Sequence, residues 1–347
     1  MKKPASSSGY RGVLIDQDGI RHGCLVDGVF EESREEFDDY LITPTFFNAH
    51  THLGDAIAKD PPYLELKSMV GPGGYKFEVL RSHSAEELRR AIIHEVEIAK
   101  KSGTAVFLDF RESGVEGLKV VEGIDGVLQL GRPRSIEEAE RMKCYGFAMS
   151  SARDHELELL FGIRKLARKR GLIFAIHAGE VDCGDVETAI ELEPDFIVHM
   201  NMCAQYLKSF IDAGIPIVSC VRSNFFFDVA NPKVYRILAE YENWLLGTDN
   251  AMFFNPSMLE EMNFSSIVVK NDLSVFRASI NGYRIFGEKL GIRRGYVVFR
   301  KDWKLKNSKN LISTLVRRAC ERDIEAVIGL KESSHLSEPA PPSLRGL

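Results

Sequence analysis

The chain has 347 residues, of which 44% are hydrophobic and 27% are charged, the composition of an ordinary globular protein. Its 45 basic and 50 acidic residues give a net charge of -5, which argues against a nucleic-acid-binding or polybasic membrane surface. No apolar run approaches the ~18 residues of a membrane span, and no apolar segment follows the basic N-terminus to make a secretory signal. The six cysteines include no C-x-x-C pair, which is typical of reduced thiols in a cytosolic protein. We therefore expect a cytoplasmic protein that binds neither nucleic acid nor membrane.

The first segment of the chain, residues 1–41, predicts short strands in "YRGVLID" and "HGCLVDGVFEE". From residue 42 the chain alternates between apolar runs typical of buried strands and amphipathic segments typical of helices. The eight apolar runs are "LITPTFF", "TAVFLDF", "GVLQLG", "GFAMSS", "LIFAIHAG", "FIVHM", "PIVSCV" and "WLLGTD". Eight strand–helix units over roughly 250 residues favour an α/β fold of the (β/α)8 barrel type for residues 42–290. A doubly wound open sheet is the alternative.

The end of the chain predicts short strands again, in "GYVVFRKDW" and in "TLVRRACERDIEAVIGLKE". We expect residues 1–41 and 291–333 to pair into a small β-sandwich subdomain beside the barrel. The tail, residues 334–347, is rich in proline and serine and is predicted to be disordered.

Metal-binding residue types fall where the predicted strands end. His50 and His52 end the first strand, His177 the fifth, His199 the sixth and Asp249 the eighth. Barrel enzymes carry their chemistry at the C-terminal ends of the strands, so these side chains are expected to converge. Singly, each has a structural explanation: alternation alone puts an H-x-H pair on one face of a strand, and Asp249 could be a helix N-cap. Together they predict a site for one divalent metal ion, with zinc favoured and iron or manganese as alternatives.

A metal ion of this kind lowers the pKa of bound water from ~16 to ~7, so a hydrolytic site also needs a group that moves protons. Glu180 follows the fifth strand in "HAGE" and is predicted to shuttle the proton, although it could instead be an acid in the first turn of a helix. Arg222 and Asn224, in "VRSN" after the seventh strand, are predicted substrate contacts, with a loop charge as the alternative for Arg222. The long segment 55–80 is predicted to form a lid or pocket wall at the barrel mouth.

Four motifs in this order, "NAHTHLGD", "IHAGE", "IVHM" and "LGTDN", resemble the amidohydrolase superfamily. They are most similar to its mononuclear aminohydrolases, which include cytosine, guanine and S-adenosylhomocysteine deaminases and the triazine chlorohydrolases. The resemblance extends over residues 10–335. Binuclear members use a lysine at the end of the fourth strand, and here that strand ends "GFAMSSARD", which favours a single metal ion.

The resemblance also implies roles for individual residues. It makes His50, His52, His177 and Asp249 the metal ligands, and Asp249 in addition accepts a proton or a hydrogen bond from the attacking water. His199 would polarise that water. Glu180 would deliver a proton to the leaving amine.

The sequence thus predicts a metal-dependent hydrolase of C–N bonds other than peptide bonds. The leading prediction is hydrolytic deamination of a heterocyclic amine, nucleobase-like or nucleoside-like, by metal-bound hydroxide. The alternatives are a cyclic amide, imine or chloro-heterocycle hydrolase of the same superfamily, and a non-catalytic metal-binding barrel. A small-molecule substrate is the expected partner, and self-association into a homo-oligomer is left open.

Overall fold

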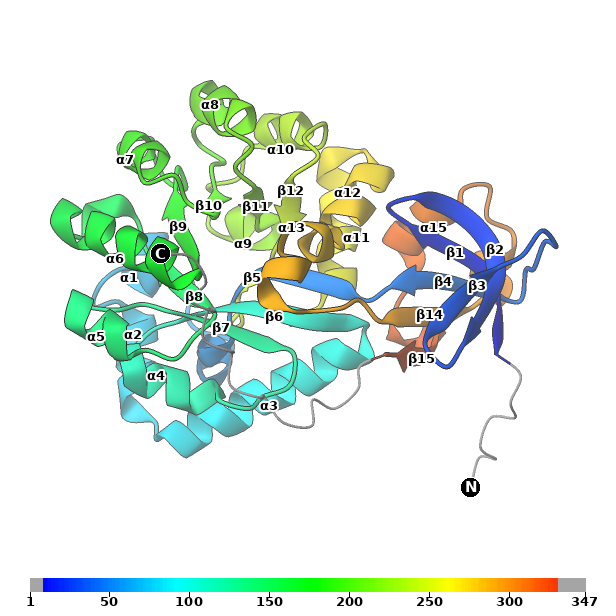
Figure 1. Cartoon of the computed structure of the whole chain (residues 1–347), viewed down its shortest axis with the longest axis horizontal. Helices are drawn as coiled ribbons and strands as arrows, with labels where there is room; N and C mark the ends of the chain where they lie inside the picture. The colour runs from blue at the N-terminus through cyan, green and yellow to red at the C-terminus, as the bar shows by residue number, and fades with distance from the viewer. Residues whose placement is uncertain (1–8, 330–347) are drawn as a thin grey trace, which may run out of the picture.

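The computed structural model describes residues 9–329, which form a barrel of parallel strands and a smaller sheet beside it (Figure 1). Neighbouring barrel strands pair in parallel and in chain order, as the (β/α)8 prediction requires. These strands are β5 (Phe46–His52), β6 (Thr104–Arg111), β7 (Val127–Gly131), β8 (Gly146–Met149), β9 (Ile173–Ala178), β10 (Phe196–His199), β11 (Ile217–Ser219), β12 (Trp244–Leu246) and β13 (Asp249–Asn250).

The eighth barrel strand is interrupted at Gly247 and Thr248, so it consists of β12 and β13. Its first half pairs with β11 and its second half pairs with β5, which closes the ring. The Gly247 amide donates to Ser219 O, and the Thr248 amide donates to His50 O, both over 3.0 Å. A Cβ atom at Gly247 would lie 2.8 Å from the backbone of His50, so glycine is needed where the two strands approach each other.

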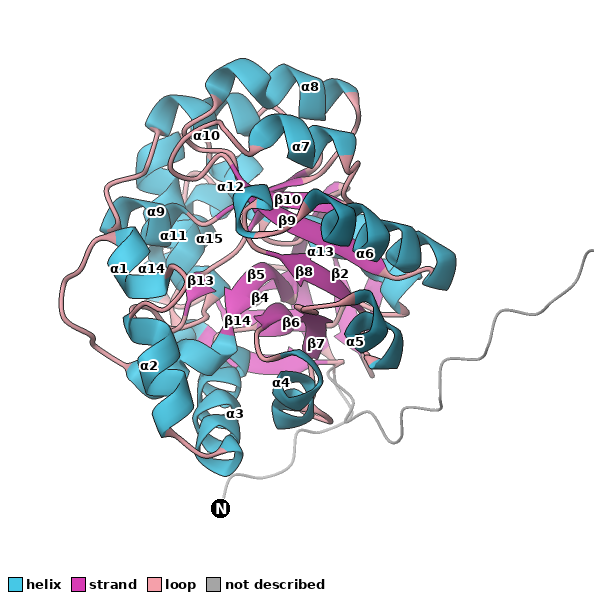
Figure 2. Ribbon diagram, turned by 90° about the vertical axis from the view of Figure 1, so that its left-hand side faces the viewer, coloured by secondary structure: helices cyan, strands magenta, loops and turns pink. Residues whose placement is uncertain are grey.

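Helices surround the barrel strands (Figure 2). Helix α3 shows why the sequence folds this way. The Ser84 side chain accepts from the Glu87 amide and the Glu87 side chain accepts from the Ser84 amide, which forms a capping box. Beyond it, Ile92, Val96 and Ala99 lie on one buried face at spacings of four and three residues. The elements between and after the barrel strands are η1 (Leu53–Ala58), α1 (Leu66–Val70), α2 (Tyr75–Ser82), α3 (Ala85–Lys101), α4 (Gly114–Val121), α5 (Ile136–Arg141), η2 (Ala152–Asp154), α6 (Leu157–Arg170), α7 (Val186–Glu191), η3 (Ala204–Tyr206), α8 (Leu207–Asp212), α9 (Val221–Phe226), α10 (Pro232–Leu238), α11 (Met258–Val269), α12 (Asp272–Ala278) and α13 (Asn281–Leu290).

The barrel interior is filled by apolar side chains from alternate strand positions. Leu128 and Leu130 of β7 belong to one cluster with residues of the other strands. At the N-terminal end of the barrel, Phe286 of α13 packs against Phe47 and Phe196, near the starts of β5 and β10, with ring centroids 6.2 and 5.3 Å away. The interior is therefore a packed core, and polar residues are left for the opposite, C-terminal end.

Both ends of the described chain contribute to the smaller sheet, as predicted. Its order is β15-β14-β4-β1-β2-β3, and Thr45 alone separates β4 from the first barrel strand. The Thr45 amide donates to Gly295 O over 3.0 Å, which holds the two chain ends together where sheet and barrel meet. The strands are β1 (Tyr10–Asp16), β2 (Gly19–Val26), β3 (Val29–Glu32), β4 (Tyr40–Pro44), β14 (Tyr296–Arg300) and β15 (Ile324–Ile328), and the remaining elements are α14 (Trp303–Lys306), α15 (Leu311–Arg318) and η4 (Glu321–Asp323).

One predicted element is wrong. The stretch "TLVRR", expected as a strand, is the second half of helix α15. Asn310 caps this helix by accepting from the Ser313 amide, and Leu315 and Val316 are buried one turn after Leu311. Only the following "IEAVI" forms a strand, β15. The tail predicted to be disordered, residues 334–347, lies outside the described residues.

Within residues 9–329, no helix is long and apolar enough to cross a membrane.

Candidate metal centre

Three of the predicted ligands, His50, His52 and His177, meet at the C-terminal end of the barrel. Each offers a ring nitrogen, and these three atoms lie within 4.8 Å of one another. The His50 ring lies 4.9 Å, centroid to centroid, from each of the other two. Burial lowers the pKa of His50 to about 3, and burial together with the neighbouring histidines lowers the pKa of His177 well below its usual value. Both imidazoles are therefore neutral, which is the form that binds metal ions.

The carboxylate of Asp249 reaches the same cluster from β13. Its Oδ1 atom lies 3.2 Å from His50 Nε2 and 3.6 Å from His52 Nε2, while Oδ2 accepts from Ser223 Oγ over 2.5 Å. Burial acts to raise the pKa of Asp249, but His50, His52 and His199 hold it well below its usual value. Neutral imidazoles next to an ionised carboxylate form a donor set that fits a divalent metal ion.

A second group of buried charges holds the His52 ring. Glu112, the residue after β6, places Oε1 3.0 Å from His52 Nδ1. Lys76 of α2 lies 2.6 Å from Glu112 Oε1 and 2.9 Å from Asp55 Oδ2. Burial acts to raise the pKa of Glu112, but Lys76 and His52 hold it well below its usual value. Where an imidazole binds a metal ion, a carboxylate beside its other ring nitrogen orients the ring, and Glu112 lies at such a position beside His52.

The His177 ring is oriented by the backbone. Its Nδ1 atom lies 2.9 Å from Met149 O, the carbonyl at the end of β8, to which it can donate. The other nitrogen, Nε2, is then left to face the cluster. By contrast, His50 Nδ1 and His52 Nδ1 are buried without a hydrogen-bond partner among residues 9–329, although Glu112 Oε1 lies 3.0 Å from His52 Nδ1.

The two residues predicted to act on water and protons lie side by side. His199 Nε2 is 3.5 Å from Glu180 Oε1, and His199 Nδ1 is 3.1 Å from Asn224 Oδ1. The amide of Asn224 donates in turn to the Tyr235 hydroxyl over 2.9 Å, which leaves its Oδ1 to accept from His199. Burial raises the pKa of Glu180, so this carboxyl group holds a proton more readily than an exposed glutamate. Asn224 thus contacts His199 and reaches the histidine cluster only through this contact.

Arg222, the other predicted substrate contact, is not brought into this cluster. Its guanidinium pairs with Glu261 over 2.6 Å and with Glu260 over 2.9 Å, and donates to Asn255 O over 3.0 Å. These partners belong to α11 and the loop before it. The contact of Arg222 with a substrate stays a prediction, and the structure gives its donors protein partners instead.

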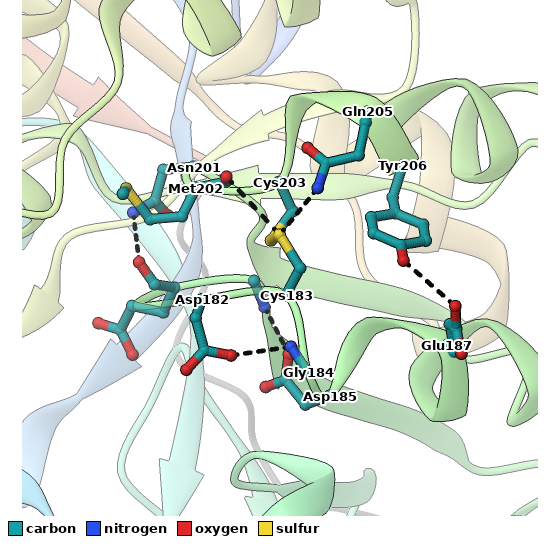
Figure 3. The surroundings of a disulfide bond; sticks show 12 residues. Asp182, Cys183, Gly184, Asp185, Glu187, Asn201, Met202, Cys203, Gln205 and Tyr206 are labelled. Carbon is teal, nitrogen blue, oxygen red and sulfur yellow. Dashed lines mark hydrogen bonds between the residues drawn. A yellow bond between two sulfur atoms is a disulfide. The ribbon is translucent and has the colours of Figure 1, made fainter.

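A disulfide links Cys183 to Cys203, contrary to the expected reduced thiols (Figure 3). Cys183 follows Glu180 in the loop between β9 and α7, and Cys203 follows His199 in the loop after β10. Asn201 adds a hydrogen bond of 3.0 Å from its side-chain amide to Glu180 O. The loops that carry Glu180 and His199 are therefore fastened to each other. A separation of 20 residues without a C-x-x-C pattern gives no sign of this pairing in the sequence.

Sequence reasoning missed Glu112, which lies against His52, Lys76, which pairs with Glu112, and Arg132, whose charge helps to lower the pKa of His177. Glu112 and Arg132 directly follow β6 and β7, so the strand-end rule that selected the histidines would have found both. Lys76 had no such signal, because it lies within the long segment 55–80. In that segment Phe77 lines a hollow, while Tyr63 is 90% exposed and stacks on a phenylalanine of α9.

Comparisons with known proteins agree with this geometry. The model of the amidohydrolase family matches residues 41–298. A relative from Archaeoglobus fulgidus, which bears a provisional name as an aminohydrolase, is 51% identical over 321 residues, 92% of this chain and 96% of that protein.

Two solved structures share the fold. One is a guanine deaminase from C. acetobutylicum with bound guanine, which has a TM-score of 0.70 and 14% identity over 91% of this chain and 97% of that chain. The other is an adenosine deaminase from Xanthomonas campestris with bound zinc, which has a TM-score of 0.68 and 15% identity over 92% of this chain and 90% of that one. At such identities the likeness shows the fold alone. The family model spans most of the chain, and the chain therefore belongs to the amidohydrolase family and is a hydrolase.

Proposed function

We propose that the protein is a metal-dependent aminohydrolase that removes the amino group of a nucleobase-like or nucleoside-like heterocycle. The observation that carries this proposal is the convergence of three imidazoles and the Asp249 carboxylate beside the Glu180–His199 pair. The deaminases with the same fold lend further support, since one holds guanine and another holds zinc.

In this proposal His50, His52, His177 and Asp249 hold one divalent ion, with zinc favoured and iron or manganese compatible with the same donors. The bound ion supplies a Lewis acid that lowers the pKa of water towards neutrality. No lysine ends β8, where Met149 is followed by two serines, so the carboxylated bridge of a binuclear site has no candidate there.

Glu180 and His199 supply the proton transfers. His199 donates through Nδ1 to Asn224, which leaves Nε2 facing Glu180 and the attacking water. The water oxygen bonds to the ring carbon that bears the amine, and Glu180 takes a proton from that water. The second proton of the water moves to the adjacent ring nitrogen. Glu180 passes the first proton to the amine nitrogen, the C–N bond breaks, and ammonia leaves while the ring keeps the water oxygen as a carbonyl.

The test is ammonia release from purines, pyrimidines, pterins and triazines that carry an amino group, measured with protein whose metal content is known. Glu180→Gln is expected to lower kcat by at least ~100-fold, since a positioned proton donor contributes about 10²–10⁴, while the metal content stays the same. Glu187→Gln is the matched control, because Glu187 is exposed on α7 and bonds only to the Tyr206 hydroxyl among the described residues.

Two outcomes would contradict the proposal. Turnover of cyclic amides or chloro-substituted rings, with no ammonia from any amine, would leave a family hydrolase that is not a deaminase. Full activity of Glu180→Gln would remove Glu180 from the proton path.

A further inference from the structure

A hollow of about 590 Å³ opens beside the histidine cluster, and its size is that of a small-molecule site. Its walls come from α2 and from the segments that follow β6, β7 and β8. Its lining includes Arg81, Glu112, Arg132, Arg134, Arg153 and His155. Because Glu112 lines the hollow and also lies 3.0 Å from His52 Nδ1, the hollow adjoins the metal centre.

Arg132 is a lining residue of the hollow whose side chain has no charged partner among the described residues. Its side chain makes no ion pair or hydrogen bond with any residue in the range 9–329, and its Nε atom is buried without a partner. Two arginines near it differ, because Arg111 pairs with Asp109 and Glu112, and Arg153 pairs with Asp182. Burying a guanidinium nitrogen without a hydrogen-bond partner is unfavourable. We therefore expect a ligand to supply the hydrogen-bond acceptor for Arg132.

The surroundings of Arg132 favour an anion as this ligand. Arg81 and Arg134 line the same hollow, and no ion pair joins either of them to a described residue. The Glu112 carboxylate is already shared by Lys76, Arg111 and His52.

The other two acids of the lining, Asp154 and Glu156, are exposed at the rim. Burial and the charge of Arg132 lower the pKa of His155, so this residue adds no positive charge at neutral pH. The hollow is therefore positive next to Arg132 and polar at its edge.

We propose that Arg132 binds an oxyanion on the substrate, so that the amine-bearing ring carries a carboxylate or phosphate substituent. The planar guanidinium can form two parallel hydrogen bonds to either group. In this arrangement the anion lies at Arg132, just after β7, and the amine lies at the histidine cluster. The charge of Arg132 therefore also sets which end of the substrate faces the metal. This inference rests on the proposed function, because it names a feature of the substrate of the same site.

The experiment measures binding by calorimetry to metal-loaded protein that carries Glu180→Gln, so that turnover does not interfere. The probes are two matched pairs: adenosine with adenosine 5′-monophosphate, and pterin with pterin-6-carboxylate. In at least one pair the anionic member is expected to bind about tenfold or more tightly than its neutral counterpart, as charged hydrogen bonds allow. The pair that shows the preference distinguishes phosphate from carboxylate.

The variants assign this preference to the residue. Arg132→Gln is expected to abolish the preference and leave binding of the neutral member unchanged, whereas Arg132→Lys should keep part of it. Arg168→Gln is the control, since Arg168 is exposed on α6 and pairs with Glu193 outside the hollow. Metal content and circular dichroism of each variant show that it is folded.

Equal binding of both members in both pairs, failure of both anions to bind, or a preference that survives Arg132→Gln would overturn the inference. Failure of the proposed function gives a different result. If anion binding depends on Arg132 but the wild type releases ammonia from no amine, the anion site stands and deamination is refuted.

Discussion

The disulfide between Cys183 and Cys203 provides a prediction about how the loops that carry Glu180 and His199 are held together. The bond can be removed by the substitution Cys183→Ser, or by reduction of the wild type with dithiothreitol. Cys183 is partly exposed, so serine can be accommodated there without burying a new polar group. Either change removes the covalent link between the loop that carries Glu180 and the loop that carries His199.

The size of the effect follows from the loop that the bond closes. The two cysteines are 20 residues apart, and closing a loop of that length costs the unfolded chain about 11 cal/mol/K of entropy, or about 3 kcal/mol at 25 °C. The free energy of unfolding should therefore fall by about 3 kcal/mol when the bond is absent. Because Asn201 still bonds to Glu180 O, the loops remain partly positioned, and kcat should fall less than in Glu180→Gln.

Urea unfolding followed by circular dichroism measures the stability, and thiol titration under denaturing conditions with and without prior reduction counts the bond. Reduction should release two additional thiols from the wild type and none from Cys183→Ser. Cys24→Ser, in β2 of the smaller sheet and outside the disulfide, is the control and should keep both the bond and the midpoint. Equal thiol counts before and after reduction would refute the disulfide, and an unchanged midpoint once the bond is lost would refute the reasoning from loop closure.

Two further predictions concern charges. Lys76→Met leaves Asp55 buried without its cation and leaves Glu112 with Arg111 and His52 as its remaining partners, so the free energy of unfolding should drop by about 3–5 kcal/mol. Equilibrium dialysis should show weaker metal binding, because Lys76 no longer holds the Glu112 carboxylate next to His52. Unchanged values for both would show that Lys76 does not support the site. Burial acts to raise the pKa of Asp272, but hydrogen bonds from neighbouring serines and from Arg317 outweigh it and lower that pKa. The ionised carboxylate thus stabilises the fold above its unfolded pKa, and this stabilisation is lost as the pH falls through the lower, folded value. Asp272→Asn should be less stable than the wild type at pH 7, the difference should shrink below about pH 4, and a difference that does not depend on pH would contradict the assignment.

Much of the barrel could be predicted because its strands are buried on both faces. Each appears in the sequence as a short apolar run between amphipathic segments, and eight such runs limit the choice of fold. The same regularity located the histidines, since a polar residue directly after a buried run lies at the open end of the barrel. Helix α15 was mistaken for a strand because it is only eight residues long, which is too short for the helical period to be distinguished from strand alternation.

What the sequence did not reveal depends on contacts between distant residues. Arg222 looks like a residue of the barrel mouth, but its partner Glu261 lies 39 positions further along the chain and draws the guanidinium away. The backbone at two site residues was equally hidden. His199 and Asp249 have φ values of 81° and 61°, in the left-handed region that is unfavourable for residues other than glycine. Such strain is typical of positions where the surrounding structure, and not local preference, sets the direction of a side chain.

The contacts around Asp249 show what imposes that conformation. Asn48, the first residue of the "NAHTH" motif, donates to Thr248 Oγ1 over 2.7 Å, and its Oδ1 accepts from the Thr248 amide over 3.1 Å. Thr51, between the two histidines, donates to Asp249 O over 3.2 Å. Residues of the first strand therefore form hydrogen bonds to Thr248 and to the Asp249 carbonyl, at the point where the eighth strand is interrupted. Asn48 and Thr51 thus place the Asp249 carboxylate against the two histidines of the motif. These contacts join the "NAHTH" and "GTDN" segments, although some 200 residues separate them in the chain.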